Sequence, residues 1–241
     1  PWELHLVHQF DTDKAAPEGF AKGDIELDGK TDIIGGGFWF KHIKDHEFEV
    51  HPIDSDYRSS RSAVGDLIEG GHPEVVLSSG DNPGSLNMYK YDGENWTKKT
   101  LIEEIVNGHS LQIEDINDDG HLDIFMAEMS AWWIYHRTQA KAYVLYGDGK
   151  GNFLESVVSE GVCHHESKVG DLNGDGKLDI LGKSFFIHGA PIDIWINQGL
   201  TDISDATITK RNIPPVYEPV KINGPTENWY GPFAESSVVF D

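Results

Sequence analysis

The sequence predicts an all-β protein built from repeated units of about four short strands. Three observations predict this fold class. A nine-residue motif rich in Asp and Gly recurs along the chain, short segments of β-branched and aromatic residues flank each copy, and no stretch keeps a helical period. The first acids of four copies, Asp24, Asp66, Asp115 and Asp171, are spaced 42, 49 and 56 residues apart. Spacings of this size are typical of the blades of a β-propeller.

The strands expected in each unit follow one order. A short strand leads into the motif, a second leaves it, and two more carry aromatic residues later in the unit. The clearest leading strands are 63–65, 111–113 and 168–170, and the returning strands are 74–77, 122–125 and 178–181. The later segments are 38–40 with 48–53, 86–89 with 96–97, 142–146 with 153–154, and 192–197.

Three copies of the motif have the composition of cation-binding loops. The copies at 24–32, 115–123 and 171–179 place side-chain oxygens at positions 1, 3, 5 and 9, with Gly at position 6. A hard cation such as Ca²⁺ takes several oxygen ligands, and the loops resemble an EF-hand loop through position 5 but lack its Glu at position 12. The sequence therefore predicts two to three Ca²⁺ ions, with the ligands Asp24, Glu26, Asp28, Asp32, Asp115, Asn117, Asp119, Asp123, Asp171, Asn173, Asp175 and Asp179. The copy at 66–74 has Ile68 and Gly70 at two ligand positions and is expected to bind none.

The repeat lengths predict how the chain is divided into blades. One β-propeller domain over 1–241 would have five blades of about 48 residues, within the usual range. The two chain ends would share the fifth blade, because 2–11 resembles an outer strand and 233–241 resembles an inner strand. A fragment of a longer propeller, for example one of seven blades, is the alternative. The expected blades are about 14–54, 55–104, 105–161 and 162–213, with a closing blade of 1–13 plus 214–241.

The run Val-Gly-Asp-Leu-Asn-Gly-Asp-Gly-Lys-Leu-Asp-Ile-Leu at 169–181 resembles the FG-GAP, or VCBS-type, repeat of calcium-binding β-propellers. The third and fourth units carry this motif in full, and the first has Glu26 where the family usually has Asp or Asn. Segments around His109 and His165 resemble bacterial propellers associated with carbohydrates, of the aldos-2-ulose dehydratase type. The resemblance implies a calcium-bound propeller with a role in carbohydrate binding or chemistry.

Charge and composition exclude several classes of partner. With 19 Lys and Arg against 41 Asp and Glu, the formal charge is −22, which argues against binding to nucleic acids or anionic membranes. The single Cys163 excludes an internal disulfide, and no apolar run has the length of a membrane span. Calcium-binding loops suit millimolar calcium outside cells, so we expect a secreted or periplasmic protein.

Position within the repeat predicts where a functional site would lie. Residues six before position 1 and about 12–13 after it should share the end of the propeller opposite the motif loops. The first group contains Glu18, Ser60, His109 and His165, the next positions add Arg61 and Glu166, and the returning strands add Ser79, Glu128 and Lys183. The candidate catalytic residues are His109, Glu128, His165, Glu166 and Lys183, and the candidate ligand-binding residues are Trp39, Arg61, Trp132 and Trp133. The same polar ring could instead line a water-filled channel.

Two classes of function fit this pattern. The first is a calcium-stabilised module that binds a carbohydrate or protein ligand at the channel mouth opposite the calcium loops. The second is a carbohydrate-active lyase or dehydratase, in which a His or Lys removes a proton and an acid or a further divalent metal in the channel stabilises the enolate. The binding function is favoured because many repeats of this type serve as scaffolds.

Overall fold

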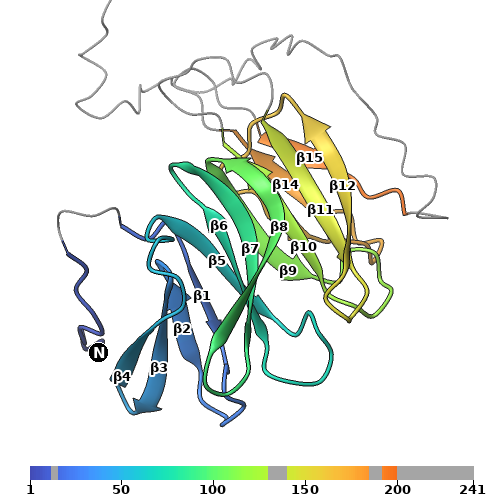
Figure 1. Cartoon of the computed structure of the whole chain (residues 1–241). Helices are drawn as coiled ribbons and strands as arrows, with labels where there is room; N and C mark the ends of the chain where they lie inside the picture. Colours follow the sequence, from blue (N-terminus) through green and yellow to red (C-terminus); the bar gives the residue numbers. More distant parts are fainter. Residues whose placement is uncertain (12–15, 130–139, 185–191, 200–241) are drawn as a thin grey trace, which may run out of the picture. The chain divides into compact units, whose positions relative to one another are not determined.

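The computed structural model describes residues 1–11, 16–129, 140–184 and 192–199. In these residues the chain is all-β, as predicted, and contains three four-stranded antiparallel sheets and one three-stranded antiparallel sheet (Figure 1). By its contacts the chain divides into two units, Pro1–Arg211 and Asn212–Asp241, and the second lies outside the described residues. The described part of the chain contains no helix that could cross a membrane.

Each sheet is formed by consecutive strands that neighbour one another in chain order. The first sheet has β1 (Phe20–Gly23), β2 (Asp32–Gly35), β3 (Phe38–Lys44) and β4 (Glu47–Pro52). The second has β5 (Ser60–Gly65), β6 (Glu74–Ser79), β7 (Pro83–Tyr91) and β8 (Trp96–Val106). The third has β9 (Gly108–Glu114), β10 (Asp123–Glu128), β11 (Lys141–Gly147) and β12 (Phe153–Glu160). The fourth has β13 (Lys168–Gly170), β14 (Asp179–Lys183) and β15 (Ile192–Trp195).

The nine-residue motif connects the first two strands of every sheet in one register. The residue before position 1 pairs with position 9 in all four units, as Gly23↔Asp32, Gly65↔Glu74, Glu114↔Asp123 and Gly170↔Asp179. The motif is therefore the same hairpin connection each time, including the copy at 66–74. This shared register explains why the repeat is visible in the sequence.

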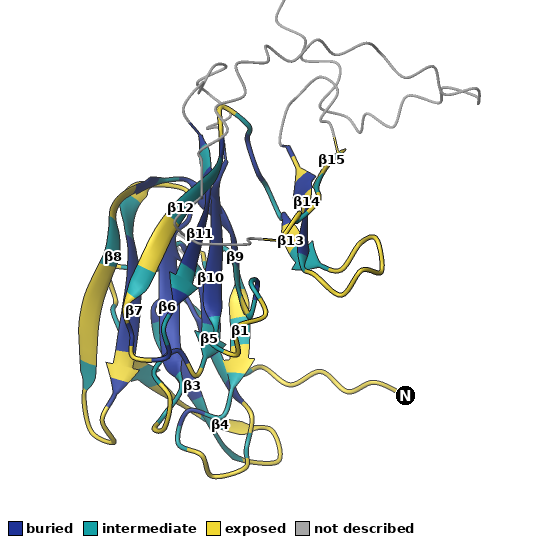
Figure 2. Cartoon of the chain, turned by 90° about the vertical axis from the view of Figure 1, so that its right-hand side faces the viewer, coloured by how far each residue is buried: buried dark blue, intermediate teal, exposed yellow. Residues whose placement is uncertain are grey.

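Apolar side chains fill the space between successive sheets. Successive residues of a strand point to opposite faces, so a strand in the middle of a sheet contributes to two interfaces. In β6, Val75 and Leu77 pack with Ile34 and Trp39 of the first sheet, whereas Val76 faces the third sheet. All residues of β6 and β10 are buried (Figure 2).

The strand β10 repeats this alternation between the second and fourth sheets. Ile124 and Met126 join the cluster with the second sheet, and Phe125 and Ala127 join the cluster that includes Ile180 of the fourth sheet. The second and third sheets thus bury both of their faces against neighbouring sheets, which is the arrangement of blades in a β-propeller.

The N-terminal segment differs from its prediction. Residues 1–11 form no strand, and Trp2 and Leu4 are fully exposed (Figure 2). The expected outer strand of a closing blade is therefore not seen, because none of the described strands pairs with this segment. Phe10 instead contacts Phe38 and Phe40 through ring edges. The other part of the expected closing blade, 214–241, lies outside the described residues.

Candidate functional site

A group of polar side chains from all four sheets gathers at one end of the strands. The first strand of each sheet runs from this end to the motif loop and the second strand returns, so residues beside the start of the first strand and the end of the second meet there. We call this group the polar end; its members are Glu18, Arg61, Asp81, His109, His165, Glu166 and Lys183. The motif loops close the opposite ends of the same strands.

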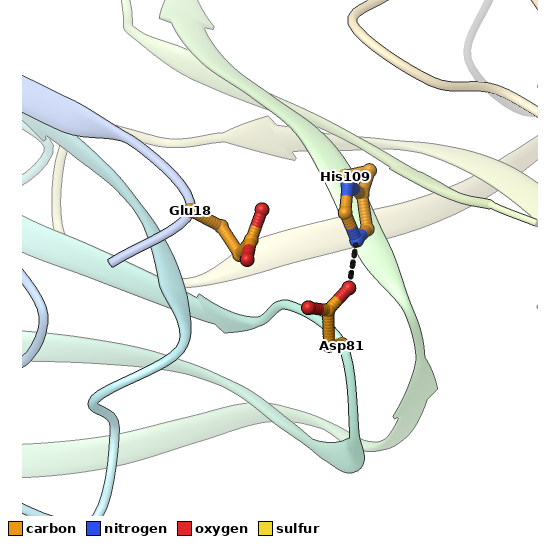
Figure 3. Close-up of side chains that lie close together, drawn as sticks. All are labelled: Glu18, Asp81 and His109. Atoms are coloured by element: carbon orange, nitrogen blue, oxygen red, sulfur yellow. Dashed lines mark hydrogen bonds and ion pairs between the residues drawn. The ribbon is translucent and has the colours of Figure 1, made fainter. Parts of the chain in front are cut away.

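Glu18, Asp81 and His109 form the innermost part of the polar end. One potential ligand atom from each of the three side chains lies within 4.8 Å of the other two (Figure 3). Among the described residues, this is the group of at least three acidic, His or Cys side chains whose ligand atoms lie so close together. His109 Nε2 lies 3.0 Å from Asp81 Oδ1, in a hydrogen bond. His109 is buried, whereas the Asp81 side chain is 52% exposed.

Gly80 allows the chain to bring Asp81 to this place. A Cβ at Gly80 would lie 2.5 Å from the Ser59 carbonyl oxygen and 2.6 Å from Glu18 Cγ. The Gly80 amide donates a hydrogen bond to the Ser59 carbonyl, and the Glu18 amide donates to the Ser60 carbonyl. Asp81 was not among the residues predicted from the sequence. It directly follows a returning strand and its glycine, and this pattern was the signal that could have identified it.

The second part of the polar end links the second, third and fourth sheets. Arg61 forms an ion pair with Glu166, and the rings of His109 and His165 stack with centroids 5.0 Å apart. Lys183 Nζ lies 3.1 Å from His165 Nδ1. The structure therefore brings together five residues that the repeat positions predicted to share one end, in addition to Glu18.

Burial sets the protonation of these groups. Burial, together with the nearby charge of Lys183, lowers the pKa of His165 to about 4. Burial also lowers the pKa of His109, against the hydrogen bond to Asp81. For Glu166, burial opposes ionisation, but the hydrogen bond and charge of Arg61 outweigh it and lower the pKa. At neutral pH the two imidazoles are neutral, while Glu166 is ionised.

Other predicted site residues have different positions. Trp39 was expected to bind a ligand, but it is 2% exposed and packs against Tyr91 and Trp96 between the first two sheets, which favours a structural role. Glu128 is buried, and its carboxylate accepts hydrogen bonds from the amides of Val106 and Lys141. These bonds favour a structural role for Glu128 over the predicted catalytic one.

Two of the remaining predicted positions, Trp132 and Trp133, lie outside the described residues. Ser60 is fully buried, and Ser79 Oγ donates to the Ile105 carbonyl.

The acids at position 9 of the motif loops form one repeated set of backbone hydrogen bonds. One oxygen of Asp123 accepts from the Ile116 amide at 2.9 Å, and the other accepts from the Gly147 amide at 2.8 Å. Asp32 accepts hydrogen bonds from the Ile25 and His42 amides. Asp179 accepts them from the Leu172 and Asn197 amides, at the equivalent positions of its unit. All three acids are buried. Burial raises the pKa of Asp123 to about 6. These three predicted cation ligands therefore also hold the hairpin to the third strand of its sheet.

The acids at positions 1, 3 and 5 have different neighbours in the loops at 115–123 and 24–32. Asp115 accepts hydrogen bonds from the amides of Asp119 and Gly120, so its oxygens face the turn. In the loop at 24–32, Lys41 and Lys30 form ion pairs of 2.6 Å with Glu26 and Asp28, respectively.

The loop at 115–123 contains no lysine, and its donor set of carboxylate and amide oxygens fits Ca²⁺. In the described structure, no three acids of one loop come within 4.8 Å of one another, so binding would require the side chains to close inward.

Stacked four-stranded sheets joined by one repeated acidic hairpin define this chain as a protein of the β-propeller class. Residues 115–182, from the third motif loop to the fourth sheet, match the family model described as an FG-GAP-like repeat. The match confirms the predicted FG-GAP type of repeat in this part of the chain. No curated protein matches the sequence.

Proposed function

We propose that the protein is a calcium-stabilised binding domain that holds a carbohydrate, or a protein, at the polar end. The observation that carries the proposal is the convergence of charged and imidazole side chains from four sheets on one end of the strands. Ligand sites combine a rigid scaffold with a few placed polar groups.

The chemistry of the polar end suits a ligand rich in hydroxyl groups. Lys183 supplies donors, Glu166 supplies acceptors, and neutral His165 can do either. Side-chain ion pairs and hydrogen bonds already orient these groups, which lowers the entropy cost of binding.

The calcium part of the proposal is supported by the oxygen-rich loops at the opposite ends of the strands. Bound there, Ca²⁺ would neutralise part of the charge of −22 and hold each hairpin without occupying the polar end. Because such loops suit the millimolar calcium found outside cells, we place the protein in a secreted or periplasmic setting.

The proposal is tested on a glycan array with the full chain, in calcium and in EDTA. Binding to a defined set of glycans is expected, and Arg61→Ala and Lys183→Ala should each weaken it at least tenfold. Lys22→Ala, which removes an exposed charge on β1, is the matched control. Equal binding by all three variants, with unchanged melting curves, would contradict the assignment to the polar end.

A lyase or dehydratase is the second candidate function, favoured by one observation. The neutral imidazole of His165 lies beside Lys183 and next to an ionised Glu166, which provides a proton acceptor and charged groups in one place. Incubation with uronate-containing polysaccharides would then generate unsaturated products that absorb ultraviolet light. Wild-type protein should form such products and His165→Ala should not; absence of any product from the wild type rejects this candidate.

A further inference from the structure

We propose that Glu18, Asp81 and His109 bind a divalent first-row transition-metal ion, with Zn²⁺ and Mn²⁺ as the candidates. The proposal rests on the proposed function, because the ion would lie within the polar end that meets the ligand. It concerns a site chemically different from the motif loops, which offer oxygen donors alone.

The spacing of the three side chains fits one small ion. Zn–N and Zn–O bonds are about 2.0–2.2 Å long, so two donors at a tetrahedral angle lie roughly 3.3 Å apart. His109 Nε2 and Asp81 Oδ1 are 3.0 Å apart, and all three donor atoms lie within 4.8 Å of one another. A small inward rotation of Glu18 would complete a three-donor set and leave coordination positions for water or a ligand group.

The second nitrogen of His109 is an independent sign of a missing partner. The residue is 3% exposed, and its Nδ1 atom is buried without a hydrogen-bond partner. Figure 3 shows the nitrogen-bearing edge of the ring turned toward the Glu18 and Asp81 carboxylates. A buried polar atom without a partner is rare and calls for one such as a bound ion, so the ring offers the cluster a second nitrogen besides Nε2.

The charges around the cluster favour a cation. Burial raises the pKa of Glu18, and the neighbouring Asp81 carboxylate raises it further, because two nearby negative charges repel. Burial keeps His109 in the neutral form that binds metals. Arg61, whose charge acts on both Glu18 and His109, is ion-paired with Glu166.

The donor types select the kind of ion. Imidazole suits zinc and other transition metals, and carboxylates suit several divalent ions including manganese, so one imidazole with two carboxylates suits Zn²⁺ or Mn²⁺ better than Ca²⁺. The exposed side of Asp81 gives such an ion access from solvent. The hydrogen bond between the Glu18 amide and the Ser60 carbonyl fixes the backbone of one ligand to the second sheet.

The test is a titration of the full chain with Zn²⁺ alone, after removal of metals and in excess Ca²⁺ that occupies the loops. One equivalent of Zn²⁺ should bind, and Asp81→Asn and Glu18→Gln should each lower its affinity at least tenfold. Asp56→Asn, at an exposed Asp outside the cluster, is the matched control and should leave the affinity unchanged. Mn²⁺ titrated in the same way should compete for the same equivalent.

A loop variant separates this site from the calcium loops. Asp119→Asn should reduce calcium binding and keep the Zn²⁺ equivalent. Absence of zinc binding in the wild type, unchanged affinity in Asp81→Asn, or loss of the equivalent in Asp119→Asn would each overturn the proposal. Because the titration contains no glycan, its result is independent of whether the proposed ligand binding is found.

Discussion

The loops at 66–74 and 115–123 close the same hairpin in adjacent sheets, yet different contacts hold them. The loop at 115–123 keeps oxygens at positions 1, 3 and 5, whereas the loop at 66–74 has Ile68 and Gly70 at two of these positions. In the loop at 66–74, the Glu69 amide donates to the Gly149 carbonyl, and Ile68 forms an isolated bridge with Lys150. Contacts with the β11–β12 turn of the neighbouring sheet thus hold the loop at 66–74.

The two loops also differ in which of their positions have a left-handed backbone. In the loop at 115–123, the left-handed residues are Asp118 and Gly120, at positions 4 and 6. In the loop at 66–74, the left-handed residue is Gly70, at position 5. Both loops have a position 9 acid that accepts hydrogen bonds from the loop's own amides. Glu74 accepts from the Leu67 and Ile68 amides, as Asp123 accepts from the Ile116 amide. The comparison teaches that the position 9 acid belongs to the hairpin itself, whereas the hairpin also closes without oxygens at positions 3 and 5.

Variants of the two loops should differ most in how calcium removal changes their melting temperature. Each ion that binds only the folded state adds about 2.7 kcal/mol at a hundredfold excess over its Kd, so two to three ions contribute several kcal/mol. EDTA should therefore lower the melting temperature sharply. Asp119→Asn should remove part of this calcium dependence and Asp66→Asn none of it, as measured by metal content and melting curves. An equal loss of bound calcium in both variants would break the comparison.

Removal of the position 9 acid should destabilise both units to a similar degree. Asp123→Ala and Glu74→Ala each leave two backbone amides without an acceptor, and a buried unpaired donor costs about 1–3 kcal/mol. Urea unfolding in EDTA should show a loss of roughly 2–5 kcal/mol for each variant. Glu155→Ala, on the exposed face of β12, serves as the control. A large loss for Asp123→Ala alone would mean that Glu74 has no comparable role.

Grafting the missing oxygens should fail to convert one loop into the other. The double change Ile68→Asn with Gly70→Asp supplies both side chains. It also removes the apolar Ile68 side chain that packs against the core between the second and third sheets, and it places a side chain at φ +79°. We expect no additional bound calcium and a destabilisation of about 1–3 kcal/mol, measured by metal analysis and urea unfolding. A tight extra calcium ion would show that side-chain oxygens alone decide binding.

The smallest effect is expected for the ion pair that joins the two loops. His121 Nδ1 lies 2.7 Å from Glu69 Oε1, and both side chains are partly exposed. Glu69→Gln should therefore lower stability by less than about 1 kcal/mol, and less still at high salt. A larger loss of stability in urea unfolding would show that this contact stabilises the protein more than its exposure indicates.

The features that could be predicted from the sequence are those that repeat with the strands. The motif fixes a hairpin, so its period indicated the sheets, and the position within the repeat indicated that His109 and His165 share an end. Asp81 could not be found in this way, because it lies in a connection after β6 and approaches Glu18 only through the tight passage at Gly80. The burial of Trp39 depends on how two sheets face each other, which one unit alone does not reveal.

Glu128 illustrates the same limit. Its repeat position indicated the polar end, but the amides of Val106 and Lys141 belong to other segments of the chain. The Val106 amide comes from β8 of the second sheet and the Lys141 amide from β11, which pairs with β10 in the same sheet, and neither contact leaves a periodic signal in the sequence.

The aromatic contact between the first two sheets gives the protein a specific optical signature. Trp39 lies with its ring centroid 5.4 Å from that of Tyr91 and 6.2 Å from that of Trp96, in edge-to-face geometry. Such a fixed, asymmetric group of buried rings contributes strongly to near-ultraviolet circular dichroism. Loss of that band, while the far-ultraviolet β-sheet signal persists, would report the separation of these two sheets before any sheet itself melts.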